Sequence, residues 1–454
     1  MSTVESEEVI GGGLLDTLFN SDDTFLPAEP QAIGELGLSP VLIESLLCKY
    51  LLQVGSAAGR QIAESIALPF ALVEPMFADL RGRQLLFHQG QAQLGDYQYA
   101  LTEQGVARAQ AAMASNSYVG PAPVPLDDYI LSVEAQSIRA EAAREDSLAN
   151  AFSDISVEPQ MLEVLGPAVN SGAGLFLYGT PGNGKTTIAK RITRCFGSHV
   201  WVPHAIIEDG QIVKFYDAAF HEPVGESHAS LLKSGASDQR WIKIKRPTVV
   251  VGGELKLDAL EIRHDPVSNI SEASLQLKSN CGCLLIDDFG RQRCEPTELL
   301  NRWIVPLENR HDFLTLASGK KIQVPFDQLI IFSTNLEPMD LADEAFLRRI
   351  PYKVEVGDPS LEEFRKLFEH SCQSLGCQYR PEAVDYLVQK HYRPFGRPLR
   401  RCQARDLLTQ VKNYCVYRGL PMELRPDYLD RAVNGYFATC GDNASRAPAE
   451  EPTL

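Results

Sequence analysis

Nine consecutive residues, from Gly179 to Thr187, have the types and the order of a loop that binds phosphate. Glycines in such a loop let backbone N–H groups turn inward around phosphate oxygens, and Lys185 is placed to reach the β- and γ-phosphates. The hydroxyl of Thr186 can ligate magnesium. The loop comprises Gly179, Thr180, Pro181, Gly182, Asn183, Gly184, Lys185, Thr186 and Thr187. The sequence therefore predicts a site for a nucleoside triphosphate, ATP or GTP, together with Mg²⁺.

Two carboxylates and an amide follow apolar runs elsewhere in the chain. Asp287 and Asp288 end the run Cys283–Ile286, and Asn335 ends the run Leu329–Thr334. In α/β proteins, ligands bind at the edge of the sheet where the carboxyl ends of the strands lie. We expect Asp287 to hold magnesium, directly or through water, and Asp288 to polarise the attacking water. Asn335 is expected to orient that water or to sense the γ-phosphate, although asparagine after a strand is also a common turn former.

Strand and helix patterns surround the phosphate-binding loop. The apolar run Leu175–Tyr178 predicts a strand that enters it, and residues from Lys185 onward have helical spacing, so the positive end of a helix points at the same anion. Upstream, Ile155 and Val157 are candidates for the adenine side of the site, ahead of a helix predicted over Met161–Val169. These elements indicate an α/β nucleotide-binding fold.

The order of these motifs resembles that of the AAA+ ATPase family. The resemblance covers residues 150–437 and includes five motifs in the family's order. They are Walker A at Gly179–Thr186, Walker B at Leu284–Asp288, sensor 1 at Asn335, an arginine-finger box at Asp343–Ile350 and a sensor 2 motif at Phe395–Arg401. The resemblance implies a three-layer αβα P-loop NTPase core and a helical lid that together bind and hydrolyse ATP with Mg²⁺.

Several arginines outside the loop have roles that the resemblance alone implies. Arg349 matches the finger position, with Arg348 as the neighbouring candidate, and Arg397 matches sensor 2. A guanidinium supplied from outside the site stabilises the charge that develops on the γ-phosphoryl oxygens. An arginine that serves a neighbour's nucleotide implies a ring homo-oligomer, expected to be a hexamer. The alternative for Arg348 and Arg349 is a solvated pair that caps a helix end, whereas Arg400 and Arg401 are expected on a solvated helix face or in an ion pair.

Walker B departs from most motors of the family, because Asp287–Asp288 stands where they have Asp-Glu. The second carboxylate is one methylene shorter, so we expect either slow hydrolysis or a different water position. An Asp-Asp pair followed by Phe289–Gly290 is also similar to the clade of replication initiators and helicase loaders. Our main hypothesis is an oligomeric, chaperone-like motor that remodels a protein partner. The alternatives are an ATP-dependent, DNA-associated switch or loader with little hydrolysis, and a nucleotide-gated scaffold without turnover.

Composition shifts along the chain predict six segments. They are a disordered acidic arm (1–38), a winged-helix-like α+β domain (39–118), a proline linker and charged helix (119–150), the α/β nucleotide domain (151–357) with an insertion at about 198–280, the helical lid (358–437) and a disordered tail (438–454). The charged helix is predicted to run from Asp127 to Asn150.

The domain at 39–118 has three helical patterns followed by two strands across a turn. They lie at Val41–Leu52, Gly59–Ile66 and Phe70–Leu80, then at Leu85–His88 and Tyr97–Leu101. This order resembles a winged helix, a fold that often binds DNA. Five Lys and Arg stand against six Asp and Glu here, whereas DNA-binding domains have a basic face. Docking to a protein is therefore favoured over contact with nucleic acid.

An insertion is required because 102 positions separate Lys185 from Asp287. A hairpin is predicted over Val200–Tyr216 with its turn at Asp209–Gly210, and further strands at Thr248–Val251 and Leu255–Ile262. Within the insertion, Phe215–Tyr216 is the aromatic candidate for a pore loop. The basic residues Lys243, Lys245 and Arg246 face either a substrate channel or solvent.

The remaining elements complete the expected architecture. Phe313–Leu316 and Lys321–Phe326 predict a hairpin that looks like the pre-sensor 1 hairpin of ring-forming family members. Beyond Asp358 the chain is mainly helical, as a lid that rotates with nucleotide state would be. The lid helices are predicted at Leu361–Cys372, Pro381–His391, Leu399–Tyr417 and Tyr428–Phe437.

Composition limits the class of protein. The chain of 454 residues is 44% hydrophobic and 22% charged, with a formal net charge of −16 that opposes binding to nucleic acid or anionic membranes. No basic residue precedes Lys49 and no apolar run reaches the ~18 residues of a membrane span, so we expect a cytoplasmic location without membrane contact. The ten cysteines lack the spacing of a zinc site and are expected to be free thiols.

Overall fold

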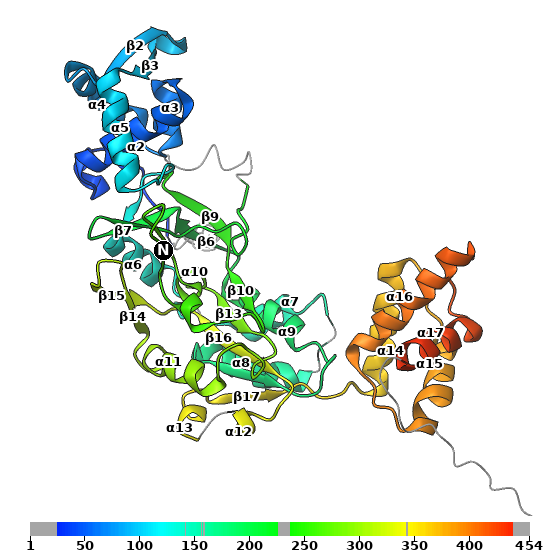
Figure 1. Ribbon diagram of the computed structural model, residues 1–454. Coiled ribbons are helices and arrows are strands. Elements are labelled where there is room, and N and C mark those ends of the chain that lie inside the picture. The colour runs from blue at the N-terminus through cyan, green and yellow to red at the C-terminus, as the bar shows by residue number, and fades with distance from the viewer. Residues whose placement is uncertain are drawn as a thin grey trace, which may run out of the picture.

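The computed structural model describes residues 25–140, 142–155, 157, 159–225, 237–341 and 344–438, apart from the side chains of Leu94, Ala345 and Ala438. Figure 1 shows the N-terminal helices stacked on a β-rich middle region, the central parallel sheet beyond it, and the C-terminal helices to one side. The sequence motifs of the phosphate loop, Walker B and sensor 1 all belong to the central sheet.

Five parallel strands form this central sheet in the order β10-β13-β16-β5-β17. Their bounds are Thr248–Val251 (β10), Cys283–Ile286 (β13), Leu329–Thr334 (β16), Leu175–Tyr178 (β5) and Tyr352–Glu355 (β17). Every residue of β13 and β16 is buried, as expected for strands covered on both faces. The predicted strands before the phosphate loop, Walker B and sensor 1 are therefore confirmed.

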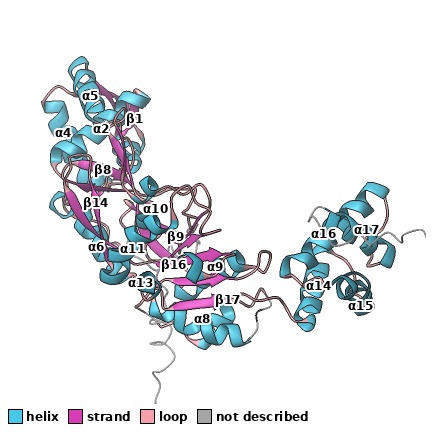
Figure 2. Ribbon diagram, turned by 60° about the horizontal axis from the view of Figure 1, so that its bottom comes forward, coloured by secondary structure: helices cyan, strands magenta, loops and turns pink. Residues whose placement is uncertain are grey.

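Helices cover both faces of the sheet, as Figure 2 illustrates. Leu175 and Leu285 face a core formed with α7 (Glu145–Ala151), α8 (Pro159–Ser171) and α9 (Lys185–Ile192), which is followed by η3 (Thr193–Phe196). Phe176 and Leu284, the neighbours of those strand residues, face a second core with α11 (Pro296–Asn309), α12 (Pro338–Leu341) and α13 (Glu344–Leu347). Successive side chains of a strand point to opposite faces. The strand residues thus build a three-layer αβα arrangement.

The N-terminal domain contains the three predicted helices and both predicted strands. Its elements are α2 (Pro40–Val54), β1 (Ser56–Ala58), α3 (Gly59–Ser65), α4 (Phe70–Gly82), β2 (Leu86–Gln91), η2 (Gln93–Gly95), β3 (Tyr97–Leu101) and α5 (Glu103–Ser115). The sequence did not indicate β1, which pairs antiparallel with β3 in a three-stranded sheet of order β1-β3-β2. These helices and strands form an α+β domain with a three-stranded antiparallel sheet.

One glycine in this domain offers a stability test. A Cβ at Gly105, in the first turn of α5, would overlap the carbonyl oxygen of Leu85. Because a backbone atom cannot move aside cheaply, we expect Gly105→Ala to lower the free energy of unfolding by about 2–3 kcal/mol. Gly82→Ala is the matched control, since open space surrounds this glycine at the end of α4 and alanine there should stabilise by about 0.5 kcal/mol. Urea unfolding of both variants measures the difference, and equal midpoints would contradict the packing described here.

The prediction of a disordered arm to residue 38 is wrong for residues 25–38. The Phe25 ring lies 5.5 Å from that of Trp241, and the Asp238 amide donates to the carbonyl of Pro27 over 3.0 Å. A short helix, η1 (Ile33–Leu36), follows, and Leu36 is fully buried. Apolar side chains fix this part of the arm despite its acidic composition, whereas residues 1–24 lie outside the described part.

The charged helix predicted from Asp127 to Asn150 is interrupted in the structure. After β4 (Val124–Pro125), α6 spans only Leu126–Ala135, and α7 begins ten residues further on. The Asp327 carboxylate accepts the hydroxyl of Ser137 over 2.8 Å and the amide of Ile138 over 3.0 Å. These bonds from a distant residue hold the chain out of the helix.

The insertion differs in extent from the prediction. Its elements are β6 (His199–Pro203), β7 (Ala205–Glu208), β8 (Gln211–Lys214), β9 (Trp241–Lys245), η5 (Leu257–Leu260), β11 (Arg263–Asp265), β12 (Ile270–Glu272) and α10 (Leu275–Lys278). The hairpin turn at Asp209–Gly210 is confirmed, but β6 pairs with β9 and not with that hairpin. Between the two parts lies β10, which belongs to the central sheet, so the insertion is divided. The strand predicted at Leu255–Ile262 is instead the short helix η5.

Side chains of the insertion that were candidates for a channel have structural contacts. Phe215 is buried and lies against the ring of Tyr129, which excludes it as a pore-loop aromatic. Lys245 pairs with Glu222, and Arg246 donates to the carbonyl of Cys281 over 2.8 Å. Lys245 and Arg246 therefore have partners within the chain.

The N-terminal domain and the insertion share one hydrophobic core. Ala205 of β7 and Ile212 of β8 are buried among residues of α2, α3 and α4. The amide of Ser117 donates to the carbonyl of Ser268 over 2.8 Å, which ties the end of the domain to the loop between β11 and β12. These contacts fix the two parts as one body (Figure 1).

The C-terminal helices form a separate body with its own core. They are α14 (Leu361–Leu375), α15 (Pro381–Leu387) with a π-helical extension (Val388–Tyr392) and the short η7 (Arg393–Phe395), α16 (Arg401–Arg418) and α17 (Pro426–Ala438). Phe364 and Leu407 are fully buried within this core. The predicted hairpin before sensor 1 is also confirmed, as β14 (His311–Thr315) and β15 (Lys321–Pro325) pair antiparallel.

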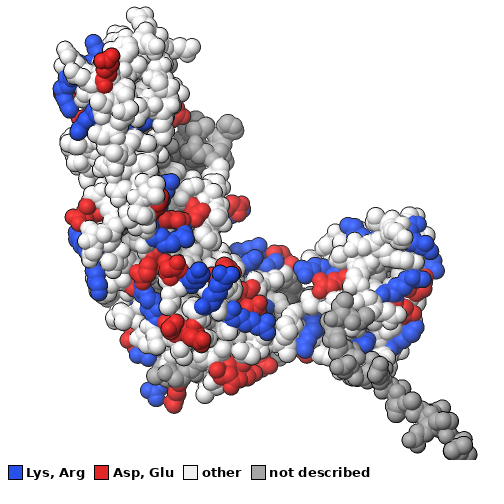
Figure 3. Space-filling model, in the orientation of Figure 1, with Lys and Arg blue, Asp and Glu red and all other residues white. Residues whose placement is uncertain are grey.

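Helix length, the cysteine thiols and the surface charges complete the description of the fold. In the described part of the chain, no helix is both long and apolar enough to span a bilayer. Nine cysteines there are free thiols, and Cys440 lies outside that part. On the face in Figure 3, basic and acidic side chains are interspersed over the central body.

Candidate functional site

The phosphate-binding loop connects β5 to α9 across the edge of the central sheet. Gly179 has a φ of 129°, and a Cβ there would lie 2.7 Å from the carbonyl oxygen of Val356. Gly182 has a φ of 86°, and a Cβ there would meet the Sγ atom of Cys402 at 2.7 Å. Only glycine fits both constraints. A glycine loop between a parallel strand and a helix gives the chain a P-loop NTPase-like α/β fold.

Lys185 is the cation at the centre of the site. Its Nζ atom donates to the carbonyls of Gly179 (2.8 Å) and Thr180 (3.1 Å) and to the Oδ1 atom of Asn335 (2.7 Å). Burial lowers the pKa of Lys185, while the charges of Asp287 and Asp288 act in the opposite direction. The structure therefore brings the loop lysine and the predicted sensor 1 residue together.

The two Walker B carboxylates contact different partners. Thr186 Oγ1 donates to Asp287 Oδ2 over 2.9 Å, so a hydroxyl and a carboxylate oxygen lie side by side. Mg²⁺ prefers oxygen ligands of this kind, and the pair fits the predicted metal site. Asn335 Nδ2 donates to Asp288 Oδ1 over 3.2 Å. Asp288 itself has a φ of 49°, which is uncommon for a residue with a side chain.

Gln292 holds this strained segment and was missed by sequence reasoning. Its Nε2 atom donates to the carbonyls of Asp287 (3.0 Å) and Asp288 (3.2 Å), and its Oε1 atom accepts the amide of Gly290 (2.9 Å). No sequence pattern marks this glutamine, because its role follows from the shape of the turn after β13.

A cavity of about 710 Å³ opens above the loop, within the range of small-molecule sites. Ile155 and Val157, the candidates for an adenine side, line one side of the cavity together with Met161. From the lid, α14 and α16 contribute Lys366, Leu367, His370, Ser371, Arg401, Cys402 and Arg405. The cavity thus lies between the central sheet and the lid.

Arg348 and Arg349 are not among the residues that line this cavity. Arg349 Nε donates to Glu308 Oε1 on α11 over 2.7 Å. Arg348 pairs with Glu344 over 3.3 Å, and the side chains of this pair are 77% and 81% exposed. A residue that serves a neighbouring copy has to lie outside its own chain's cavity, and Arg349 meets this condition. The exposed Arg348 instead matches the alternative of a solvated residue at a helix end.

The structure places Arg397 away from the cavity, whereas Arg400 and Arg401 are in ion pairs, one of the two alternatives expected for them. Arg397 lies against the rings of Phe395 and Phe437, with its guanidinium carbon 4.6 and 4.0 Å from their centroids, and it does not line the cavity. Arg400 instead contacts Thr180 of the loop, and Arg401 lines the cavity and pairs with Glu363 over 3.1 Å. Arg397 is held by aromatic packing that the motif alone did not reveal.

Asp358, at the start of the lid, connects three parts of the site. It accepts bonds from Asn183 Nδ2 (2.7 Å) and Thr180 Oγ1 (3.0 Å), and it pairs with Arg400. Burial alone would raise the pKa of Asp358, but the bonds from Asn183 and Thr180 and the charge of Arg400 lower it. Sequence reasoning missed Asp358, although an acid just after a core strand is a usable signal.

We expect Asp358→Asn to loosen the contact between lid and loop, because an amide carries no charge for Arg400. Protease cleavage in residues 356–360 should become about two- to fivefold faster, in line with the modest strength of a partly exposed ion pair. Since the pKa is depressed, the wild-type contact is present above the ordinary carboxyl pKa and is lost as pH falls through the lowered value. Asp385→Asn is the control, because Asp385 is equally exposed but pairs only within the lid, with Arg365. Equal cleavage of the two variants would contradict the role of Asp358.

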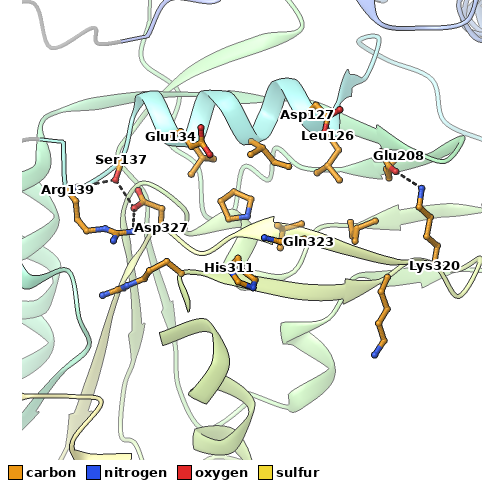
Figure 4. A pocket seen from close by; sticks show the side chains of 17 residues that line it. Leu126, Asp127, Glu134, Ser137, Arg139, Glu208, His311, Lys320, Gln323 and Asp327 are labelled. Atoms are coloured by element: carbon orange, nitrogen blue, oxygen red, sulfur yellow. Dashed lines mark hydrogen bonds and ion pairs between the residues drawn. The ribbon is translucent and has the colours of Figure 1, made fainter. Parts of the chain in front are cut away.

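A second cavity, of about 800 Å³, lies between α6 and the β14–β15 hairpin (Figure 4). Glu208 pairs with Lys320 at one end over 2.7 Å, and Arg139 pairs with Asp327 at the other over 3.3 Å. It shares no lining residue with the cavity above the phosphate loop. This cavity is therefore separate from the candidate site.

Comparison with known proteins gives only distant similarities. Residues 360–435, within the C-terminal helices, match a family described as a domain of unknown function (DUF8689). A search of curated proteins finds no match to the sequence. The crystal structure of NtrX from Brucella abortus has a TM-score of 0.40 at 17% identity, covering 77% of this chain and 69% of that one. Two RuvB mutants from Thermotoga maritima have TM-scores of 0.34 and 0.33 at 12% and 13% identity, covering 66% of this chain and 72% and 73% of theirs. These scores are too low to carry an argument about function.

Proposed function

We propose that the protein is an ATPase of the AAA+ type that binds ATP and Mg²⁺ between the phosphate-binding loop and the lid. One observation supports this most strongly. Lys185, the Thr186–Asp287 pair and the Asp288–Asn335 pair meet at one edge of the sheet through side-chain contacts of 2.7 to 3.2 Å. Each group that phosphoryl transfer needs for binding, metal coordination and water activation is therefore adjacent to the others.

Each residue has a defined task in this proposal. The loop amides and the N-terminus of α9 bind phosphate oxygens, and Lys185 exchanges its carbonyl contacts for the β- and γ-phosphates. Thr186 and Asp287 hold Mg²⁺, which neutralises phosphate charge when bound. Asp288 polarises the water that attacks, and Asn335, already bonded to Asp288, orients it.

In the same proposal Arg349 completes the site of a neighbouring copy. Its position away from the chain's own cavity supports this role, and a ring homo-oligomer, a hexamer, would place one finger at each interface. On the lid, Arg401 takes the nucleotide-facing role that the motif assigned to Arg397, since Arg401 lines the cavity.

The substrate of the proposed motor is a protein. The N-terminal domain and the insertion form one body through their shared core, which suits an adaptor that transmits motion to a bound partner. Acidic residues slightly outnumber basic ones in this domain, and the interspersed charges in Figure 3 do not favour a polyanion.

Turnover at increasing protein concentration tests the proposal. Phosphate release per chain should rise with concentration, because each site needs an arginine from a second copy. ATP binding without phosphate release at any concentration would overturn the ATPase and leave a nucleotide-gated scaffold.

The alternative is an ATP-dependent, DNA-associated switch with little hydrolysis. The shorter carboxylate of Asp288 and the winged-helix-like order of the N-terminal elements favour it. Filter binding with duplex and single-stranded DNA separates the two hypotheses. Salt-sensitive affinity at micromolar level or better would support the switch, and its absence would support the protein-directed motor.

A further inference from the structure

We propose that Glu308 is the positioning residue of Arg349, and that α11 links this pair to the Walker B turn of the same chain. The inference rests on the proposed function, because it requires Arg349 to serve a neighbouring site. It assigns a role to a helix that contains none of the five motifs.

The contact between Glu308 and Arg349 is direct. Glu308 Oε1 accepts from Nε of Arg349 over 2.7 Å and lies 2.7 Å from Nη2 of the same guanidinium. The Arg349 side chain is 27% exposed and that of Glu308 49% exposed, so the pair sits at the surface with the arginine the more enclosed partner. Two contacts to one carboxylate oxygen restrict how the guanidinium can be oriented.

The other end of α11 follows the Walker B turn. Only residues 289–295 separate Asp288 from Pro296, the first residue of the helix. Gln292 lies in this short connection and bonds the carbonyls of both Walker B aspartates. The 14 residues of α11 then span about 21 Å to Glu308 and Asn309. One helix therefore connects the water-activating carboxylate to the residue that holds the finger.

Two residues in the middle of α11 fix the helix to the core. Arg302 bonds both carboxylate oxygens of Asp312 on β14 at 2.8 Å each, and Asp312 is buried. Trp303 is fully buried, and its ring lies 5.8 Å from that of Phe332 on the sensor 1 strand β16. These contacts hold the middle of the helix against the core, so α11 keeps a fixed geometry between the Walker B turn and Glu308.

Phe332 also touches the segment that carries the finger. Its ring lies 6.3 Å from that of Phe346 in α13, three residues before Arg349. Figure 1 and Figure 2 both place α13 next to α11. The segment that carries Arg349 is thus packed through Phe346 onto the sensor 1 strand, while Arg349 itself contacts the Glu308 carboxylate.

A mixture of two inactive variants tests the inference. Arg349→Ala chains keep an intact site but lack a finger, whereas Asp288→Asn chains supply a finger but cannot activate water. Phosphate release should recover on mixing, at sites where an Arg349→Ala chain is completed by an Asp288→Asn neighbour. Glu308→Gln is then added to one partner at a time.

Glu308→Gln should act only in the chain that donates the finger. In the Asp288→Asn partner we expect recovered kcat to fall about tenfold with KM for ATP changed by less than about twofold, because a misoriented finger affects the transition state and not ground-state binding. In the Arg349→Ala partner the same substitution should change nothing. Glu308→Asp should restore part of the activity, because it keeps the charge.

Controls separate this role from general damage. Glu344→Gln in the finger-donating chain removes the neighbouring, exposed Arg348 pair and should have no effect. An equal loss from Glu308→Gln in either partner would show a structural role and overturn the inference. Absence of recovery with Glu308 intact would instead overturn the trans-acting finger of the proposed function, which separates the two failures.

Discussion

Replacement of Lys185 by alanine is expected to abolish ATP turnover while the fold is kept. The ammonium is buried and contacts three oxygen acceptors, two carbonyls of the loop and the amide oxygen of Asn335. Loss of one charge-stabilising donor at a reacting centre costs about 100-fold or more in rate. The alanine variant leaves all three acceptors without this donor, which costs the fold about 1–3 kcal/mol for each acceptor that water does not reach.

Phosphate release and circular dichroism together check this expectation. Lys190→Ala is the matched control, because Lys190 is an exposed lysine of the same helix α9. The control should retain full turnover and the same spectrum. Undiminished phosphate release from a folded Lys185→Ala protein would refute the assignment of the loop as the nucleotide site.

Replacement of Arg349 by alanine is expected to remove turnover but not ATP binding. A finger arginine contributes about a thousandfold or more to the rate of phosphoryl transfer. Arg349 is not among the residues that line the chain's own cavity, so nucleotide affinity should stay within about twofold of wild type. This pattern distinguishes it from Lys185→Ala, which should weaken binding as well.

Titration with a fluorescent ATP analogue measures nucleotide affinity, phosphate release measures turnover, and mass photometry measures the oligomeric state. Arg348→Ala is the control, since its side chain is 77% exposed and pairs only weakly with Glu344. A protein that stays monomeric with and without ATP, yet turns over at the wild-type rate, would contradict a finger acting in trans.

The parts of the site that the sequence predicted are those set by local patterns. The strand, glycine loop and helix around Lys185 are contiguous, and each has its own composition signal. Asp287 and Asn335 could be placed together because each follows an apolar run, and parallel strands end at the same edge of a sheet. In the structure these residues line one cavity, as their positions in the sequence predicted.

The parts that were missed depend on contacts between distant residues. β10 has the same Val-rich pattern whether it is an edge strand of the core or a strand of the insertion, and only its pairing with β13 decides between them. The sequence made Phe215 a candidate for a pore-loop aromatic, but in the structure its ring packs against that of Tyr129. Arg397 satisfies the motif but is held by Phe437, 40 positions away, so Arg401 occupies the cavity.

The core shared by the N-terminal domain and the insertion determines how this protein can be dissected. Removing residues before 119 would uncover Ala205 and Ile212, which are now fully or almost fully buried, and would also remove the partner of Ser268. A shortened chain of this kind would expose an apolar surface and aggregate. In a size measurement this aggregation would look like oligomer assembly, and in a binding experiment it would look like the loss of a partner site. The function of the domain is therefore better studied by surface substitutions in the intact chain.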